Sequence, residues 1–485
     1  MRTNRFRVAA VAVALAVAVA ACGGGDDDGG AAGVAQESTT TSTEPPQDGQ
    51  METSVPEIEE PIEPMGDPSQ VDTDTTESAD QVMIAAALDV EEFWRSTYPE
   101  VYEEDYEEIA GGFWTYGPDT EGADLPPCPG VTAYEDIAVN AFYCSDGDLI
   151  AWDREGLVEP FIEEFGAFTA AVVMAHEFGH AIQARTGDFD TLRSVISELQ
   201  ADCFAGAWVA HVIDGESEAF QADLDDLDVA IAGLIEIRDA PGSSPDDPQA
   251  HGSGFDRVSA FSDGIDEGAA RCAGYGTEEP VVVQQVFDTQ EESSMGDLPA
   301  EELLPLLVGD LEDYYAGLFE QLGSPWEEIS DVQIVDPARD EVECGGDVLA
   351  PEDIEFGVYY CVDENTVVLD GVELVPALEE IGDFALGAEL ARQWSFAAQV
   401  QQGNTDNSKE SLLNADCLTG LYAGDVFFKL RPDSELSLSA GDLDEAIISF
   451  LAFGGDAESG SPFERTEAFR TGFLGGFDDC EALLA

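Results

Sequence analysis

Residues 170–208 read AAVVMAHEFGHAIQARTGDFDTLRSVISELQADCFAGAW, and this stretch predicts two consecutive helices. The first is expected to have Pro160 in its first turn and to end before Gly187, since proline favours helix starts and glycine favours helix ends. The second is expected to be N-capped by Asp190 and to run to about Val212, because its apolar residues recur at helical spacing. The stretch therefore indicates a helix-dominated domain.

Five residues of this helix pair form a candidate metal centre. His176 and His180 lie four residues apart on one helical face, the spacing needed to hold one zinc ion. Glu177 lies a step round the helix, where it can reach a water at the metal. Glu198 returns on the second helix as a third ligand and leaves the fourth position for water. Asp202, one turn further on, is a candidate to accept a hydrogen bond from a ligating imidazole. The alternatives are a surface pair of histidines and solvated helix acids.

Three sequence blocks also resemble the signatures of a known family. The blocks are HEFGHAIQ at 176–183, ELQADCFAGAW at 198–208 and HGSGFDR at 251–257, with AFYC at 141–144 upstream. They resemble the bacterial putative neutral zinc metallopeptidases over about residues 88–275. The resemblance implies zinc on His176, His180 and Glu198, with Glu177 as general base, in a gluzincin-like arrangement. Ala181 differs from the family, since many members carry a histidine there.

His251 opens the third block and is a further candidate catalytic residue. Its imidazole is suited to donate a hydrogen bond to the oxyanion that forms when a peptide bond is hydrolysed. The alternative is that His251 merely caps the helix expected over 253–269. His211, at the end of the second predicted helix, is expected to be structural.

An internal repeat divides the folded chain into two copies. Four cysteines recur at an offset between 208 and 217 residues, together with surrounding apolar and acidic residues. Two α+β domains dominated by helices are therefore expected, a zincin-like one over 82–285 and a degenerate copy over 300–485. Eight cysteines in an oxidising compartment are then expected to pair within each copy. The predicted disulfides are Cys128–Cys144, Cys203–Cys272, Cys344–Cys361 and Cys417–Cys480.

The second copy has lost every residue of the candidate zinc site. Aligned with His176, Glu177, His180, Glu198 and His251 are Arg392, Gln393, Phe396, Leu412 and Ser459. The second copy is therefore predicted to be a pseudoenzyme domain that cannot bind zinc in this way. Asp202 is retained as Asp416, which indicates that the role of this aspartate is at least partly structural.

The N-terminus resembles the signal of a bacterial lipoprotein. Residues 1–22 combine a positive start with an apolar run, and they end in VAAC at Cys22, which resembles a lipobox. The resemblance implies lipidation of Cys22 and an extracytoplasmic location, anchored at the outer face of the cell membrane. An ordinary secretory signal is the alternative. Residues 23–81 lack Lys and Arg and are rich in acids, Thr and Pro, so a disordered acidic tether is expected.

Composition narrows the range of partners. The 485 residues include 104 Asp and Glu against 17 Lys and Arg, a formal net charge of -87. Such acidity excludes general affinity for nucleic acid, which requires a basic surface. A hydrophobic content of 44% is enough to build a core in most of the chain.

The sequence thus predicts a membrane-anchored zinc metallopeptidase with one zinc ion per chain and a peptide or protein substrate. Two alternatives remain open at this stage. One is a non-catalytic binding or scaffold lipoprotein with a structural zinc. The other is a zinc amidase that acts on a non-peptide, cell-wall substrate. The sequence specifies neither a cleavage preference nor an oligomeric state.

Overall fold

The structure is a computed structural model that describes residues 78–289, 291–455 and 459–484. The predicted signal peptide, its lipidation site Cys22 and the predicted tether as far as residue 77 lie outside the described residues. Within the described ranges, no helix is long and apolar enough to cross a membrane.

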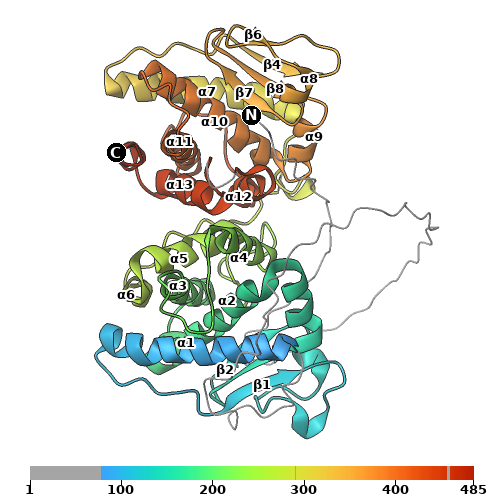
Figure 1. Ribbon diagram of the computed structural model, residues 1–485, viewed down its shortest axis with the longest axis vertical. Coiled ribbons are helices and arrows are strands. Elements are labelled where there is room, and N and C mark those ends of the chain that lie inside the picture. Colours follow the sequence, from blue (N-terminus) through green and yellow to red (C-terminus); the bar gives the residue numbers. More distant parts are fainter. Residues whose placement is uncertain (1–77, 290, 456–458, 485) are drawn as a thin grey trace, which may run out of the picture.

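The first half of the described chain, about residues 78–285, consists of helices packed on a small mixed sheet (Figure 1). Strand β3 is central in this sheet, with β1 parallel on one side and β2 antiparallel on the other. The strands are β1 (Gly112–Tyr116), β2 (Ala141–Cys144) and β3 (Leu149–Asp153). The helices are α1 (Ser78–Tyr102), α2 (Glu159–Thr186), α3 (Ser194–Ile213), α4 (Leu224–Glu236), α5 (Gly254–Glu267) and α6 (Ala269–Ala273).

The second half has the same sheet topology. Strand β8 is central, with β4 parallel and β7 antiparallel to it. The strands of the second half are β4 (Asp331–Val335), β5 (Glu343–Cys344), β6 (Asp347–Val348), β7 (Val358–Cys361) and β8 (Thr366–Asp370). Its helices are α7 (Ala300–Leu322), α8 (Pro351–Ile354), α9 (Leu374–Glu379), α10 (Asp383–Gln401), α11 (Lys409–Phe427), α12 (Asp442–Phe453), α13 (Pro462–Leu474) and α14 (Phe477–Ala482). The predicted helix-dominated α+β class is confirmed.

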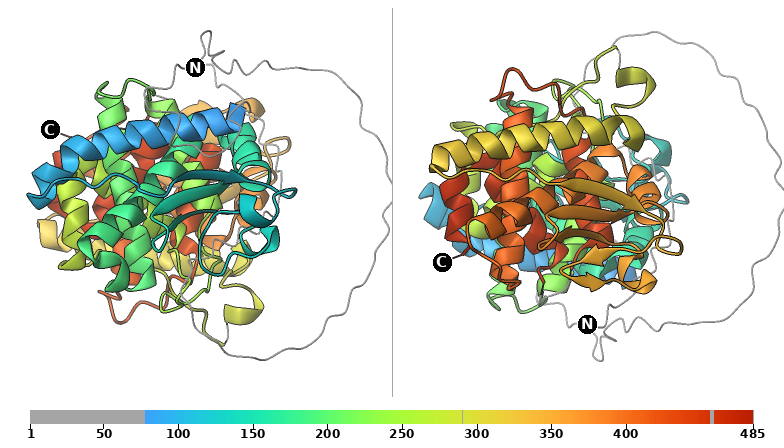
Figure 2. Two further views of the ribbon diagram at one scale, coloured as in Figure 1. Left: turned by 90° about the horizontal axis from the view of Figure 1, so that it is seen from below. Right: turned by 90° about the horizontal axis from the view of Figure 1, so that it is seen from above.

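The two halves lie one above the other and meet through helices. Helices α4 and α5 of the first half contact α12 and α13 of the second. Figure 2 shows that α1 crosses the outer side of the first half with the sheet at one end, and that α7 does the same on the second half. The sheets therefore lie away from the contact between the halves, and the helices form it.

The local predictions around the central helices were confirmed in part. Helix α2 has Pro160 in its first turn and ends at Gly187, whose φ of 85° is in the left-handed region, but it is interrupted by a kink at Gly166 (φ 80°, ψ 169°) that was not predicted. The predicted N-cap at Asp190 was wrong, because Asp190 lies in a 3₁₀ turn and α3 begins only after Arg193. That turn is closed by hydrogen bonds from Thr191 N and Leu192 N to Asp188 O, so the helix starts later.

Helix α1 begins at Ser78, inside the segment that was expected to be tether. The reason is a buried carboxylate in its first turn. Asp80 accepts a hydrogen bond from Trp152 Nε1 at 2.9 Å, and its other oxygen lies 3.3 Å from Arg154. These contacts attach the start of α1 to the end of β3 and supply the order that the local sequence does not.

All four predicted disulfides are confirmed, and each lies within one half. They join Cys128 to Cys144, Cys203 to Cys272, Cys344 to Cys361 and Cys417 to Cys480. In each half the second bridge ties the long central helix to a short one, α3 to α6 in the first half and α11 to α14 in the second.

Glycines allow an unusually close approach of two helices in each half. A Cβ added at Gly206 of α3 would lie 1.9 Å from the carbonyl oxygen of Phe261 in α5. The same distance separates a Cβ at Gly264 from the carbonyl oxygen of Cys203. In the second half, a Cβ added at Gly420 of α11 would lie 1.8 Å from the carbonyl oxygen of Phe469. Any side chain at these positions would force the paired helices apart.

Substitution of Gly206 by alanine is therefore expected to destabilise the first half by about 1–3 kcal/mol, the range of overpacking in a dense core. The matched control is Gly317→Ala in α7, where an added Cβ meets no atom within 4 Å. There alanine should stabilise the helix by up to about 1 kcal/mol, from helix propensity alone. Chemical denaturation of both variants measures the difference. Equal effects of the two substitutions would contradict the close approach of α3 and α5.

Candidate metal centre

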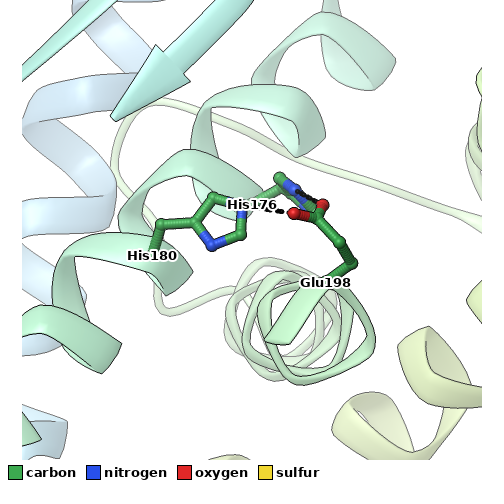
Figure 3. A group of neighbouring side chains, drawn as sticks. All are labelled: His176, His180 and Glu198. Atoms are coloured by element: carbon green, nitrogen blue, oxygen red, sulfur yellow. Dashed lines mark ion pairs between the residues drawn. The ribbon is translucent and has the colours of Figure 1, made fainter. Parts of the chain in front are cut away.

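Helices α2 and α3 bring His176, His180 and Glu198 together. The Nε2 atom of His176 lies 3.2 Å from Glu198 Oε2, and the Nε2 atom of His180 lies 3.5 Å from Glu198 Oε1. Figure 3 shows the imidazole of His180 and the carboxylate of Glu198 facing one another, with His176 beside them. One ligand atom from each residue lies within 4.8 Å of the other two, and all three side chains are buried. This group can hold a metal ion.

The remaining ring nitrogens are held by acceptors. His176 Nδ1 lies 2.7 Å from Asp202 Oδ1, and His180 Nδ1 lies 2.9 Å from Gln183 Oε1. The amide nitrogen of Gln183 donates to the carbonyl oxygen of Ser197, so the amide oxygen is free to accept from His180. With Nδ1 of each ring facing an acceptor, Nε2 is the nitrogen that would bind a metal once the ring is neutral.

Asp202 occupies the position expected for it, and Gln183 was not predicted as a site residue. The signal for Gln183 was present, since it follows His180 by three residues and so shares a helical face. Ser197 Oγ also donates to Gln183 Oε1, at 2.8 Å. Sequence spacing alone does not reveal this partner, because Ser197 belongs to α3.

Arg257 of α5 neutralises Asp202. Its Nε and a terminal nitrogen donate to the two Asp202 oxygens, each at 2.9 Å, and both side chains are buried. Burial alone would raise the pKa of Asp202, but Arg257 and then His176 hold it below its usual value. Arg257 ends the third sequence block, which gave it no role at the site.

One oxygen of the Glu198 carboxylate lacks a hydrogen-bond donor among the described residues. Within the described chain, its buried Oε2 atom receives no hydrogen bond of good geometry. Burial opposes its charge, yet His180 and His176 hold the pKa of Glu198 well below the usual range. Burial also opposes protonation of His176, but the carboxylates of Asp202 and Glu198 outweigh it and raise its pKa to about 10. Two imidazole nitrogens and one unsatisfied carboxylate form a donor set that fits zinc.

Glu177 lies beside the three candidate ligands and outside their set. Its Oε2 atom accepts a hydrogen bond from the backbone nitrogen of Tyr143 in β2, at 2.8 Å. Burial raises the pKa of the Glu177 carboxyl, against the opposing charges of His176 and His180. Strand β2 thus positions a carboxylate whose pKa lies above the usual value of a glutamate, which favours proton uptake by a general base.

His251 lies in the loop before α5, and it does not cap that helix. Ser253 is the N-cap, and its hydroxyl accepts from Asp256 N. The Asp239 carboxylate makes two contacts with His251. Its Oδ2 accepts from the backbone nitrogen at 2.8 Å, and its Oδ1 lies 3.2 Å from ring Nδ1. The capping alternative was therefore wrong. Asp239 was not predicted, because it is distant in sequence from every motif. His211 pairs with Glu216 at the end of α3 and takes no part in the group.

A pocket between α2 and α4 leads to these residues. About 570 Å³ of empty space lies in and above it, a volume that includes its opening to solvent. Its polar lining comes largely from His176, Glu177, His251 and Arg257. Its walls are mainly apolar, with Phe161, Val172 and Val173 from α2 and Ala230, Gly233 and Leu234 from α4.

The fold and the site define a helix-dominated α+β domain that carries two histidines and a glutamate as a candidate metal centre. Residues 134–275 match the model of a family described as putative neutral zinc metallopeptidase. The resemblance predicted from the motifs is therefore confirmed, and the matched segment contains His176, Glu177, His180, Glu198 and His251.

Curated relatives match part of the chain. Uncharacterized protein YpfJ of Escherichia coli (strain K12) is 32% identical over 158 residues, which are 28% of this chain and 54% of that protein. Uncharacterized protein Rv2575 of Mycobacterium tuberculosis (strain ATCC 25618 / H37Rv) is 28% identical over 154 residues, 27% of this chain and 53% of that protein. The chain therefore spans about half the length of these relatives. No solved structure shows a significant match.

Removal of one imidazole is expected to abolish zinc retention. We expect His180→Ala to lose its zinc after dialysis, because only two of the three protein ligands remain. His211→Ala is the matched control, since it removes a histidine from the same half outside the group. Metal analysis should find one zinc per chain in the control and in the unaltered protein. Equal zinc in both variants would show that the metal binds elsewhere.

Proposed function

We propose that about residues 78–285 form a zinc metallopeptidase. One observation carries the proposal: Nε2 of His176, Nε2 of His180 and the carboxylate of Glu198 converge beside Glu177, and His176 and Glu177 line a pocket that opens to solvent. A structural zinc site is usually closed by four protein ligands, whereas this group offers three.

Each residue has a defined part in the proposed hydrolysis. When bound, zinc supplies a Lewis acid that polarises a carbonyl oxygen and lowers the pKa of water to about 7. Glu177 takes the proton of the attacking water and later delivers it to the leaving amine. His251 donates to the oxygen that becomes negative in the tetrahedral intermediate. Asp202, with Arg257, keeps His176 in the tautomer that leaves Nε2 free.

The Glu177→Gln variant should retain one zinc per chain and lose at least about 10²-fold in kcat. The amide keeps the shape of the side chain but accepts no proton from water, and general base catalysis contributes about 10²–10⁴-fold. Cleavage of an unstructured polypeptide, with and without a chelator, measures the loss. Unchanged turnover in the variant would contradict the proposed mechanism.

The same assay separates the two alternatives. A scaffold with a structural zinc would bind the metal and show no chelator-sensitive cleavage of any substrate. A zinc amidase would cleave a cell-wall amide and leave polypeptides intact. Either result would replace the peptidase proposal.

The apolar walls of the pocket support a preference for a large apolar side chain next to the scissile bond. Val173 lies in one wall and is only partly buried, so it can be enlarged with little effect on the core. Val229 of α4 is 38% exposed and is not among the residues that line the pocket, so it provides a matched control.

We expect peptides with Leu or Phe beside the scissile bond to exceed those with Ala by about 10–200-fold in kcat/KM, as apolar pockets discriminate by size. Val173→Phe narrows the pocket and should lower the Phe-to-Ala ratio at least about 10-fold, whereas Val229→Phe should retain it. Peptide libraries measure the ratio. The same ratio in both variants would show that this pocket does not select the substrate.

We also propose that the mature protein is anchored outside the cell through lipidated Cys22. The lipobox resemblance at residues 19–22 supports this location. Four disulfides are consistent with it, because such bonds persist in oxidising compartments.

The second half, residues 300–485, is proposed to be a degenerate copy of the first. The shared strand order and the paired glycines at the helix crossings support this origin. Gln399 Nε2 donates to Ser411 O at 2.8 Å, as Gln183 does to Ser197 in the first half. At the position of His176, Arg392 Nε lies 2.7 Å from Asp416 Oδ1. Arg392 thus binds Asp416 in the second half, as His176 binds Asp202 in the first.

A further inference from the structure

We propose that Asp444 of the second half is a positioning residue for His251 of the first half. The inference rests on the proposed function of His251 at the zinc site. It gives the second half a specific part in the reaction, because one of its side chains would determine where a catalytic imidazole stands.

Asp444 lies at the start of α12 and is buried against the first half. Its Oδ1 atom accepts a hydrogen bond from the backbone nitrogen of Phe255, in the first turn of α5, at 2.8 Å. Its Oδ2 atom lies 3.1 Å from Nε of Arg238. The side chain of Asp444 is 4% exposed and that of Arg238 is 23% exposed. A single carboxylate therefore bridges two segments of the first half.

Those two segments are the ones that hold His251. Arg238 immediately precedes Asp239, whose carboxylate binds the backbone nitrogen and the ring of His251. Phe255 follows His251 by four residues. The segments are also joined directly, since Asp239 N donates to Gly252 O at 3.0 Å and Gly252 N donates to Asp239 Oδ2 at 3.1 Å. Asp444 of the second half contacts both segments, through Arg238 and through the backbone nitrogen of Phe255.

The backbone is shaped to receive the carboxylate. A Cβ added at Gly254 would lie 3.1 Å from Asp444 Cγ and 3.0 Å from Arg238 Cδ. Glycine at this position lets the aspartate reach the first turn of α5, where the free N–H groups and the helix dipole favour an anion. Ser253, the N-cap of the same helix, satisfies Asp256 N and leaves Phe255 N to Asp444.

The candidate zinc ligands belong to other helices, and α5 reaches them through Arg257, which binds Asp202. His176, His180 and Glu198 are held by α2 and α3. Loss of the Asp444 carboxylate should therefore displace the His251 loop and leave zinc bound. The expected signature is a fall in kcat with little change in KM, because His251 would act on the developing oxyanion and not on the bound substrate.

A double-mutant cycle in the full chain tests this role. Asp444→Asn keeps the shape of the side chain and should lower kcat at least about 10-fold, with one zinc per chain. In a His251→Ala background the same substitution should change kcat less than about 2-fold, because residues that act through one another are not additive. Additive losses would show that Asp444 only stabilises the protein, and would overturn the proposal. If Asp444→Asn does not fold, Asp444→Glu, which moves the charge by one methylene, takes its place.

Asp228→Asn is the matched control. Asp228 of α4 is also an acid at the contact between the halves, where it accepts from Ser461 Oγ at 2.9 Å and Phe463 N at 2.6 Å. Among the described residues, no hydrogen bond or ion pair joins Asp228 to the His251 loop. This variant should weaken the contact between the halves while kcat stays the same.

An NMR readout makes the test independent of turnover. The chain has only four histidines, so their ring signals can be assigned by substitution. Asp444→Asn should shift the His251 ring signals, and Asp228→Asn should leave them in place. Unmoved His251 signals in Asp444→Asn would overturn the positioning role. Shifted signals in a protein that hydrolyses no peptide would refute the proposed function and retain the structural coupling.

Discussion

The carboxylate of Asp202 joins the three helices that make the site. It binds His176 of α2 through Nδ1 and Arg257 of α5 through two nitrogens, while Asp202 itself belongs to α3. A buried charge left without a partner costs several kcal/mol, so none of the three groups can shift independently. The Asp202 carboxylate therefore fixes the orientation of the His176 ring, and with it the position where the three candidate ligands converge.

The second half retains the same framework without the histidines. Asp416 of α11 binds Arg465 of α13 and Arg392 of α10, so the carboxylate again joins three helices. With two arginines as partners, it needs no ring or metal to balance its charge. The carboxylate–arginine pair is thus common to both halves, whereas the candidate metal ligands occur only in the first.

The sequence predicted features that depend on local spacing or on the repeat. The two histidines of α2 and the glutamate of α3 follow from helical periodicity, and four cysteines in register specified the disulfides. Features set by contacts between distant segments were missed. Asp190 was expected to cap α3, but hydrogen bonds to Asp188 O close a 3₁₀ turn there. Asp239 and Asp444 could not be distinguished among 104 acidic residues, because only the folded chain brings them to the His251 loop.

X-ray absorption at the zinc edge of the purified full chain tests the central claim most directly. The account predicts one four-coordinate zinc per chain, with two imidazole nitrogens at about 2.0–2.1 Å, one carboxylate oxygen and one oxygen that the protein does not supply. The exogenous oxygen should be exchanged for an added inhibitory anion. A zinc ion closed by a fourth protein ligand, or a chain that binds no zinc, would contradict a catalytic centre at His176, His180 and Glu198.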